Sequence, residues 1–282
     1  MRRYKWPVLL LLASGLLFGC SNTDKSSTEP NKKEPAQESG QADLSQVTAD
    51  YREYATAEIE EFVKKTEEFA NAVIAGDVER AKELYAPARM HYERSEPIAE
   101  AFADLDPKID ARKGDVPDSE WRGYHRIEKG LWVENTTKGY EKYAEQLIED
   151  AKLLRAKVET VEVTPDLLIT GAVDLLNEVT TSKVTGEEDR YSHTDLYDFV
   201  ANVQGAEKIY ELLSPALKEK DEALAEEIEQ RFDAVYGLLN KYKKGEGYIS
   251  YTELSKEQVK ELSQAINELA EPLSKLGIVL EG

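Results

Sequence analysis

Six consecutive residues are the most informative part of this chain: Gly123-Tyr124-His125-Arg126-Ile127-Glu128. They contain one of only three histidines in 282 residues, and a carboxylate follows that histidine three positions later. On a helix, residues three apart lie on the same face, one above the other. His125 and Glu128 can therefore bind one metal ion together, or they can form an ordinary surface pair. The rest of the sequence has to separate these two interpretations.

The N-terminus has the features of a lipoprotein export signal. A few basic residues precede an almost entirely apolar run, residues 7–18, and Cys20, the only cysteine, follows its end. This order is typical of a secretory signal, and the run is shorter than the roughly 20 residues that cross a bilayer. Leu17-Phe18-Gly19-Cys20 resembles a bacterial lipobox. We expect residues 1–19 to be a signal peptide and Cys20 to carry a lipid anchor of the palmitate type, at the outer face of the cell membrane.

The segment after the cysteine is polar throughout. Residues 21–44 are mostly Ser, Thr, Lys, Glu, Pro, Gln and Gly, with almost no apolar side chains. Such a segment cannot bury enough surface to offset the entropy lost on ordering. We therefore expect residues 20–44 to be the lipidated cysteine and a disordered tether, and residues 45–282 to be one folded domain.

The chain is strongly acidic, with a formal net charge of −20 at pH 7. Binding of nucleic-acid phosphates needs a basic surface, so we expect no nucleic-acid partner. A negative field attracts cations instead, although salt screens it beyond about 10 Å. The same charge also fits simple solubility outside the cell, so it does not by itself establish a cation function.

Apolar residues recur at steps of three and four along the region after the tether, which predicts an all-α fold. The first helix covers about residues 51–73, Gly76 follows its end, and Asp77 can cap the next helix. Pro87 is a possible break in the second helix, and residues 158–163 are the only strand-like run. The pattern indicates one helical bundle, or two bundles sharing a core. Further helices are expected at about residues 78–103, 119–131, 138–158, 165–181, 194–213, 215–242 and 255–276.

Acidic segments surround all three histidines and supply candidate ligands. Glu93 and Glu96 repeat the three-residue spacing, which suits a solvated acidic face but also gives the paired carboxylates that a hard cation needs. His91 lies two residues before Glu93, on the wrong side for joint coordination, so we interpret it as structural. Ser192-His193-Thr194-Asp195 looks like the start of a helix, where these residues serve capping.

Several other chemistries have little support. There is no second thiol for a disulfide, and Met90 is the only methionine after the expected signal, so a Cu(I) site is disfavoured. The nucleophile pattern Gly-x-Ser-x-Gly and the zinc pattern His-Glu-x-x-His are both absent from the sequence.

Gly123-x-His125-x-x-Glu128 resembles the Gly-x-His-x-x-Glu signature of imelysin-like proteins. This segment, extended to residues 124–132, occurs with three others, residues 92–100, 104–110 and 190–196. Together they resemble the EfeO/EfeM iron-uptake proteins. The four segments occur in the same order as in that family, and the similarity covers essentially all of residues 45–280.

The resemblance implies two packed four-helix bundles and a binding protein without enzymatic activity. Such a protein captures Fe³⁺ or Fe²⁺ outside the membrane and supplies a membrane permease, alongside a haem-dependent peroxidase of the same uptake system. A mostly oxygen site of this kind suits iron, and we expect Zn²⁺ or Cu²⁺ to bind it in vitro. Glu188 is a weaker candidate ligand, and Tyr92 and Tyr124 are candidates to hydrogen-bond the ligands. The family's metal ligands map onto Glu93, Glu96, Asp110, His125 and Glu128.

Two other functions remain open. Some imelysin-like proteins are classed as peptidases, and a His-x-x-Glu pair can hold catalytic zinc. Relatives of this fold have also been linked to polysaccharide, although an acidic surface is a poor partner for an anionic polymer. Some relatives carry an N-terminal cupredoxin-like domain; here the expected signal and tether occupy the residues before 45, which favours iron binding and delivery over iron oxidation.

Overall fold

The computed structural model describes residues 43–281, except residue 103, and these residues are almost entirely helical. The only strands among them are β1 (Lys243–Lys244) and β2 (Gly247–Tyr248), a short antiparallel pair. The predicted all-α class is therefore confirmed. No helix in the described part of the chain is long and apolar enough to cross a membrane. Cys20 and the expected signal peptide lie outside the described residues, as does nearly all of the expected tether.

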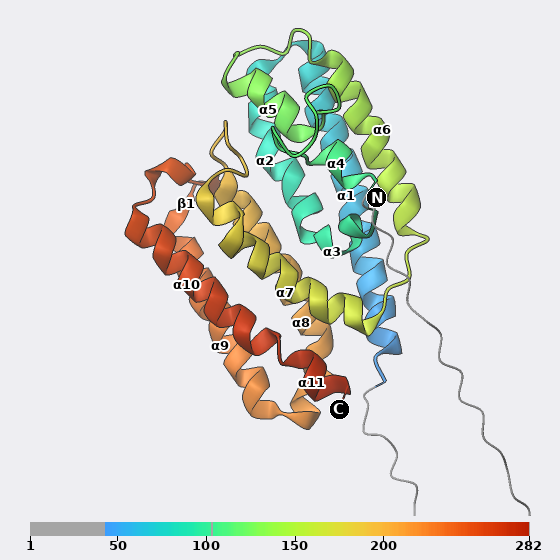
Figure 1. Cartoon of the computed structure of the whole chain (residues 1–282), viewed down its shortest axis with the longest axis vertical. Helices are drawn as coiled ribbons and strands as arrows, with labels where there is room; N and C mark the ends of the chain where they lie inside the picture. The colour runs from blue at the N-terminus through green and yellow to red at the C-terminus, as the bar shows by residue number, and fades with distance from the viewer. Residues whose placement is uncertain (1–42, 103, 282) are drawn as a thin grey trace, which may run out of the picture. The chain divides into compact units, whose positions relative to one another are not determined.

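The first half of the described chain forms one helical bundle (Figure 1). Helix α1 packs along both α2 and α6, and the shorter α5 lies against the same two helices. The short helices α3, η1 and α4 lie in the connection between α2 and α5. The bounds are α1 (Ser45–Ala75), α2 (Val78–Arg94), α3 (Glu96–Ala99), η1 (Glu100–Phe102), α4 (Asp106–Ile109), α5 (Tyr124–Trp132) and α6 (Glu141–Val158).

The second half forms a bundle of four long helices (Figure 1). Helix α7 packs against α8, α8 against α9, α9 against α10, and α10 returns to α7. The two bundles that the resemblance implies are thus both present. The bounds are α7 (Pro165–Thr181), η2 (Lys183–Thr185), α8 (Asp195–Lys220), α9 (Glu222–Leu239), η3 (Asn240–Tyr242), η4 (Tyr251–Glu253), α10 (Lys256–Leu273) and α11 (Leu276–Glu281).

Helices α2 and α8 pack against each other and join the bundles. At Gly205 a side-chain carbon would lie 2.7 Å from the carbonyl oxygen of Arg94, so a glycine is what lets the two backbones approach. Buried apolar side chains of both bundles form one continuous core. Charged side chains of both helices are buried along this junction.

Helix boundaries differ from the prediction mainly at prolines. Helix α2 continues through Pro87 to Arg94, and α8 continues through Pro215 and ends at Lys220. The expected boundary at Pro215 is therefore wrong. The break falls at Asp221, whose side chain accepts a hydrogen bond from the Leu224 amide and so caps α9. A proline removes one backbone donor, and tertiary packing along a long helix can outweigh that loss.

Of the other local predictions, two helix caps are confirmed, and a helix start and a strand-like run are wrong. The side chains of Asp77 and Thr164 cap α2 and α7 as predicted. The helix expected from residue 119 begins only at Tyr124, and the strand-like run 158–163 contains no strand.

Candidate metal centre

Charged side chains are buried where α2, the segment between α4 and α5, and the start of α8 meet. We call this group the acidic cluster. Its buried cations are Arg89, Lys183 and His125, and its carboxylates outnumber them. Burial of an unbalanced set of charges is costly, so such a group is uncommon unless a cation completes it. The carboxylates are Glu93, Glu96, Asp110, Glu128, Glu188, Asp189, Asp195 and Asp198.

Gly123 positions the histidine against the end of α4. Its φ angle is +88°, in the left-handed region that favours glycine. A side-chain carbon there would lie 2.2 Å from the carbonyl oxygen of Ile109, so no other residue fits without a shift of the backbone. This close approach brings Asp110, the residue after α4, beside His125 in the first turn of α5. The backbone angle and this close contact together explain why the six-residue stretch begins with a glycine.

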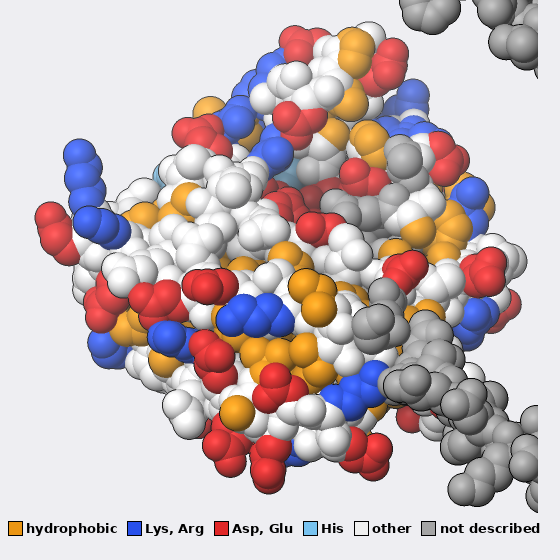
Figure 2. Space-filling view, turned by 60° about the horizontal axis from the view of Figure 1, so that its bottom comes forward, with side chains coloured by type: hydrophobic (Ala, Val, Ile, Leu, Met, Phe, Trp, Pro, Cys, Tyr) orange, Lys and Arg blue, Asp and Glu red, His pale blue; other side chains and the backbone are white. Residues whose placement is uncertain are grey.

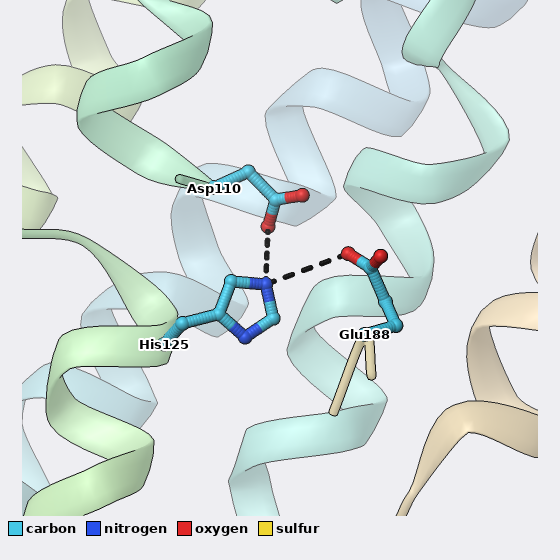
Figure 3. Close-up of side chains that lie close together, drawn as sticks. All are labelled: Asp110, His125 and Glu188. Carbon is cyan, nitrogen blue, oxygen red and sulfur yellow. Dashed lines mark ion pairs between the residues drawn. The ribbon is translucent and has the colours of Figure 1, made fainter. Parts of the chain in front are cut away.

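The Nε2 atom of His125 is buried, has no hydrogen-bond partner and faces two carboxylates. It lies 3.5 Å from an oxygen of Asp110 and 3.5 Å from an oxygen of Glu188 (Figure 3). Ligand atoms bound to one ion at about 2.0–2.2 Å lie roughly 3–3.5 Å apart. Figure 3 shows the two carboxylates converging on this nitrogen from different segments. The three side chains are therefore spaced as ligands of a single ion.

The Nδ1 side of the same ring is already satisfied by protein groups. Nδ1 lies 3.2 Å from Glu128 Oε2 and 3.2 Å from the Tyr85 hydroxyl. The other oxygen of Glu128 accepts hydrogen bonds from the Tyr191 amide and from the amide and hydroxyl of Ser192. In metal sites, a hydrogen bond from the ring nitrogen that does not bind the metal fixes the orientation and the tautomer of the histidine. Once the ring has lost a proton to a bound metal, this arrangement leaves the Nε2 lone pair directed toward Asp110 and Glu188.

Glu93 and Glu96 belong to the cluster but are held by other residues. Glu93 accepts from Arg89 at 2.6 Å through one oxygen, and from Lys183 at 2.5 Å through the other. Glu96 accepts from Asn202 at 2.9 Å, and Lys183 lies 3.5 Å away. Among the described residues, neither belongs to a group of ligand atoms close enough to share an ion with His125. Their direct coordination of the metal stays a prediction.

Arg89 lies at the centre of the cluster and is only 1% exposed. Its guanidinium pairs with Asp110 and Glu93, and lies 3.5 Å from both Glu188 and Asp189. One arginine therefore links carboxylates from both bundles. It partly balances their charge in the absence of an ion, and it holds them close enough together to form a site.

The acid–base properties of the cluster reflect its excess of carboxylates. Burial and the nearby Arg89 lower the pKa of His125, but contacts with Glu128 and Glu188 and the charge of Asp110 outweigh them and raise it to about 10. Burial raises the pKa of Asp110 to about 7, against the opposing charges of Arg89 and His125. Without an ion, the cluster therefore holds protons at neutral pH that a metal would displace.

A cleft of about 240 Å³ leads from the surface to the cluster. Asp110 and Glu188 line it, and so do carboxylates nearer the surface, Asp106, Asp115 and Glu178. The guanidinium of Arg112 also lines the cleft and donates to Glu188 at 2.8 Å. Figure 2 shows acidic side chains gathered in a hollow of the surface. A cation thus has an acidic route to Asp110 and Glu188, the two carboxylates that face His125.

The structure brings together part of the predicted ligand set. Asp110, His125 and Glu128 lie within the two groups of ligand atoms close enough to hold one ion, as does the weaker candidate Glu188. The fifth member, Asp189, was not predicted, because it stands in a segment with no periodic spacing. Those two groups are Asp110–His125–Glu188 and His125–Glu128–Asp189.

The tyrosine that contacts the histidine is Tyr85, which was not predicted. The two expected tyrosines bond elsewhere: Tyr92 donates to Asp106, and the Tyr124 hydroxyl pairs with Thr66. Tyr85 lies one helical turn before Arg89 on the buried face of α2, and this spacing was the available signal.

The other two histidines lie apart from the ligand groups. His91 pairs with Glu58 at 2.8 Å, in agreement with a structural role. His193 precedes α8 as expected, but the side chain of Thr194 does not cap that helix. The hydroxyl of Thr194 instead donates a hydrogen bond to Asp189, a member of the acidic cluster.

Comparison with known proteins agrees with this architecture. The imelysin (Peptidase M75) family model matches residues 47–276. An Efem/EfeO family lipoprotein of Staphylococcus haemolyticus (strain JCSC1435) is 50% identical over 288 residues, which cover 98% of this chain and 99% of the relative. One of Staphylococcus aureus (strain NCTC 8325 / PS 47) is 51% identical over 249 residues, covering 85% and 87%. The chain therefore belongs to the imelysin family, and within it to the Efem/EfeO family of lipoproteins.

Proposed function

We propose that this protein is the lipid-anchored, extracytoplasmic iron-binding component of an Efe-type uptake system. It captures Fe³⁺ or Fe²⁺ and passes the ion to a membrane permease, with a haem-dependent peroxidase as the third component. Cys20 carries the anchor, and the acidic cluster holds the ion. The names of the similar lipoproteins support the general assignment, and the geometry around His125 supports the binding step.

One observation carries the proposal: His125 Nε2 is buried without a hydrogen-bond partner between two carboxylates, 3.5 Å from each. A buried polar atom without a partner is unfavourable unless something else occupies its direction. A hard cation satisfies the nitrogen and both oxygens at once. In this arrangement Asp110, His125 and Glu188 contact the ion, and Glu128 orients the imidazole.

The surroundings favour a cation over any other ligand. The carboxylates exceed the buried cations, so an added positive charge lowers the electrostatic cost of the cluster. The oxygen-rich donor set matches iron better than a soft metal such as Cu(I). The acidic cleft provides access, and the ion displaces protons from Asp110 and His125 as it binds.

Metal titration of residues 21–282, which keep every described residue, tests the proposal. Wild type is expected to bind one iron per chain. His125→Ala and Asp110→Asn are expected to lose at least about 100-fold in affinity, because a ligand is removed. Glu134→Gln changes an exposed carboxylate on the loop after α5 and serves as the control. Equal affinity in all four proteins would refute the proposed site.

A zinc-dependent peptidase of the imelysin type is the alternative, and the family name supports it. Catalytic zinc sites usually combine several neutral ligands with an open position for water. Here His125 is the only imidazole among the ligand groups of the described residues, and carboxylates supply every other ligand atom. Anionic ligands reduce the acidity of a metal-bound water, which works against hydrolysis. Cleavage of a protein substrate by the zinc-loaded protein, and its loss in His125→Ala, would favour the peptidase.

A further inference from the structure

A second pocket, of about 600 Å³, lies between α4, the segment that leads to α5, and the start of α6. It adjoins the acidic cleft, because Pro107 and Val116 line both. We call it the Trp121 pocket. Besides those two residues, its walls include Lys108, Trp121, Arg122, Lys142 and Tyr143.

Trp121 forms a fixed wall of this pocket. The side chain is 1% exposed, and its indole nitrogen donates to the Ala111 carbonyl at 2.8 Å. The guanidinium carbon of Arg126 lies 4.8 Å from the centre of the indole and 5.2 Å from the centre of the Tyr143 ring. Aromatic faces attract cations at such distances. The two rings therefore hold Arg126 in place without a carboxylate.

Three cations around the Trp121 pocket have no carboxylate partner. Within the described part of the chain, the side chains of Lys108 in α4, Arg126 in α5 and Lys142 in α6 form no ion pair or hydrogen bond. The Nε atom of Arg126 is buried without a partner. This is unexpected in a sequence with 56 acidic and 36 basic residues. Unpaired like charges repel one another, and an anion bound among them removes that cost.

The carboxylates near this pocket do not cancel its positive charge. Asp150 pairs with one terminal nitrogen of Arg122 at 2.7 Å. Asp104 lines the pocket, and its ion-pair partner is Lys157, at 3.8 Å. Glu120 also lines the pocket, but it is exposed and pairs with no cation of the described residues. The unpaired cations therefore remain available to a ligand from solution.

The position of the pocket beside the acidic cleft suggests which anion it takes. Ferric iron stays dissolved in neutral water only when chelating anions, such as organic polycarboxylates, surround it. A chelate with a net negative charge is repelled by the carboxylates of the cleft. A positively charged pocket that shares a wall with the cleft offsets this repulsion, because it attracts the organic anion while the cleft attracts the metal.

We propose that the Trp121 pocket binds the small polycarboxylate that brings iron to the protein. Lys108, Arg122 and Lys142 bind its carboxylates, and the carbon skeleton packs against Trp121 and Tyr143. The iron exchanges its ligands, and the organic anion leaves chemically unchanged. This inference rests on the proposed iron-binding function and specifies the form in which the iron arrives.

Citrate is the probe, and isothermal titration calorimetry of iron-free residues 21–282 measures its binding. Wild type is expected to bind one citrate per chain. The double variant Lys108→Gln/Lys142→Gln should bind citrate at least about 10-fold more weakly, because two charge-assisted contacts are lost. Lys218→Gln/Lys241→Gln is the matched control, since it removes the same charge from exposed positions of the second bundle. Its citrate affinity should stay within about twofold of wild type.

A second measurement separates this pocket from the iron site. The affinity for Fe²⁺ without citrate, measured anaerobically, should agree within about threefold in wild type and both double variants, because neither variant removes an iron ligand. Iron uptake from ferric citrate, followed by stopped flow, should slow at least about fivefold only in Lys108→Gln/Lys142→Gln. Circular dichroism checks that all three proteins are folded.

Two results would overturn the inference: a wild type that binds no citrate, or equal citrate affinity in wild type and Lys108→Gln/Lys142→Gln. Both are obtained without iron. Failure of the proposed function is a separate result, because it would appear as wild-type iron affinity in His125→Ala, whatever the citrate titration shows.

Discussion

Replacement of Glu128 by glutamine is expected to weaken iron binding about 10- to 100-fold while the protein stays folded. In the wild type, one oxygen of Glu128 accepts three hydrogen bonds from Tyr191 and Ser192, and the other lies 3.2 Å from His125 Nδ1. A glutamine keeps its single oxygen toward the three donors. Its amide NH₂ therefore turns toward Nδ1 of the histidine.

That exchange reverses the preferred tautomer of the ring. Nδ1 must accept from the glutamine amide, so the proton of the neutral imidazole moves to Nε2, where the ion should bind. Iron binding then requires the other tautomer and loses a charge-assisted hydrogen bond worth about 1.5–3 kcal/mol. Since about 1.4 kcal/mol corresponds to a tenfold change, the loss is roughly 10- to 100-fold.

Chelator competition measures the affinity of Glu128→Gln, and ¹⁵N NMR of labelled histidine in the Zn²⁺ complex reports the tautomer. The wild-type complex should show a proton on Nδ1 of His125 and the metal on Nε2. Glu134→Gln is the matched control, because Glu134 is exposed on the loop after α5. Wild-type affinity in Glu128→Gln would refute the orienting role. A loss as complete as that of His125→Ala would indicate that Glu128 binds the ion directly.

Iron affinity should fall with decreasing pH, because the ion displaces protons from its ligands as it binds. His125, whose pKa is raised to about 10, releases one proton at any pH below that value. Asp110, whose pKa is about 7, releases a second proton only below neutral pH. The logarithm of Fe²⁺ affinity, measured anaerobically, should therefore rise by about one per pH unit above pH 7 and about two below it, and a flat profile would contradict this. Saturating Fe³⁺ should raise the melting temperature of wild type and leave that of His125→Ala unchanged in a thermal scan; an equal rise in both would place the ion elsewhere. Gly123→Ala should lower the free energy of unfolding by more than Gly139→Ala does. Both glycines have left-handed φ angles, which cost an alanine about 1–2 kcal/mol. Only at Gly123 would the new side-chain carbon also lie 2.2 Å from the Ile109 carbonyl oxygen. Equal losses in denaturant unfolding would contradict that explanation.

The sequence predicts the helical class well because apolar periodicity survives in long amphipathic helices. It predicts helix ends less well, as Pro215 illustrates. A proline weakens a helix locally, but α8 packs against α2, α7 and α9, and these contacts keep it helical until Asp221. The capping signal of Asp221 was present in the sequence and would have placed the break correctly.

The metal centre could be predicted only in part, for a different reason. His125 and Glu128 share a helix, so their spacing alone brings them together. Asp110 and Glu188 reach the histidine through loop geometry and the contact between bundles, which single-sequence periodicity does not encode. The burial of Lys183 was also unexpected, because lysine is almost never fully buried unless paired, and its partners are distant in sequence.

The position of the bound ion tests the central claim most directly. A crystal structure of the iron-loaded protein, with anomalous scattering measured at the iron edge, locates the metal without assumptions about its ligands. We expect one ion about 2.1 Å from His125 Nε2, bound also by Asp110 and Glu188, with Glu128 on the opposite side of the ring. An iron peak away from His125, or bound on its Nδ1 side, would contradict the account.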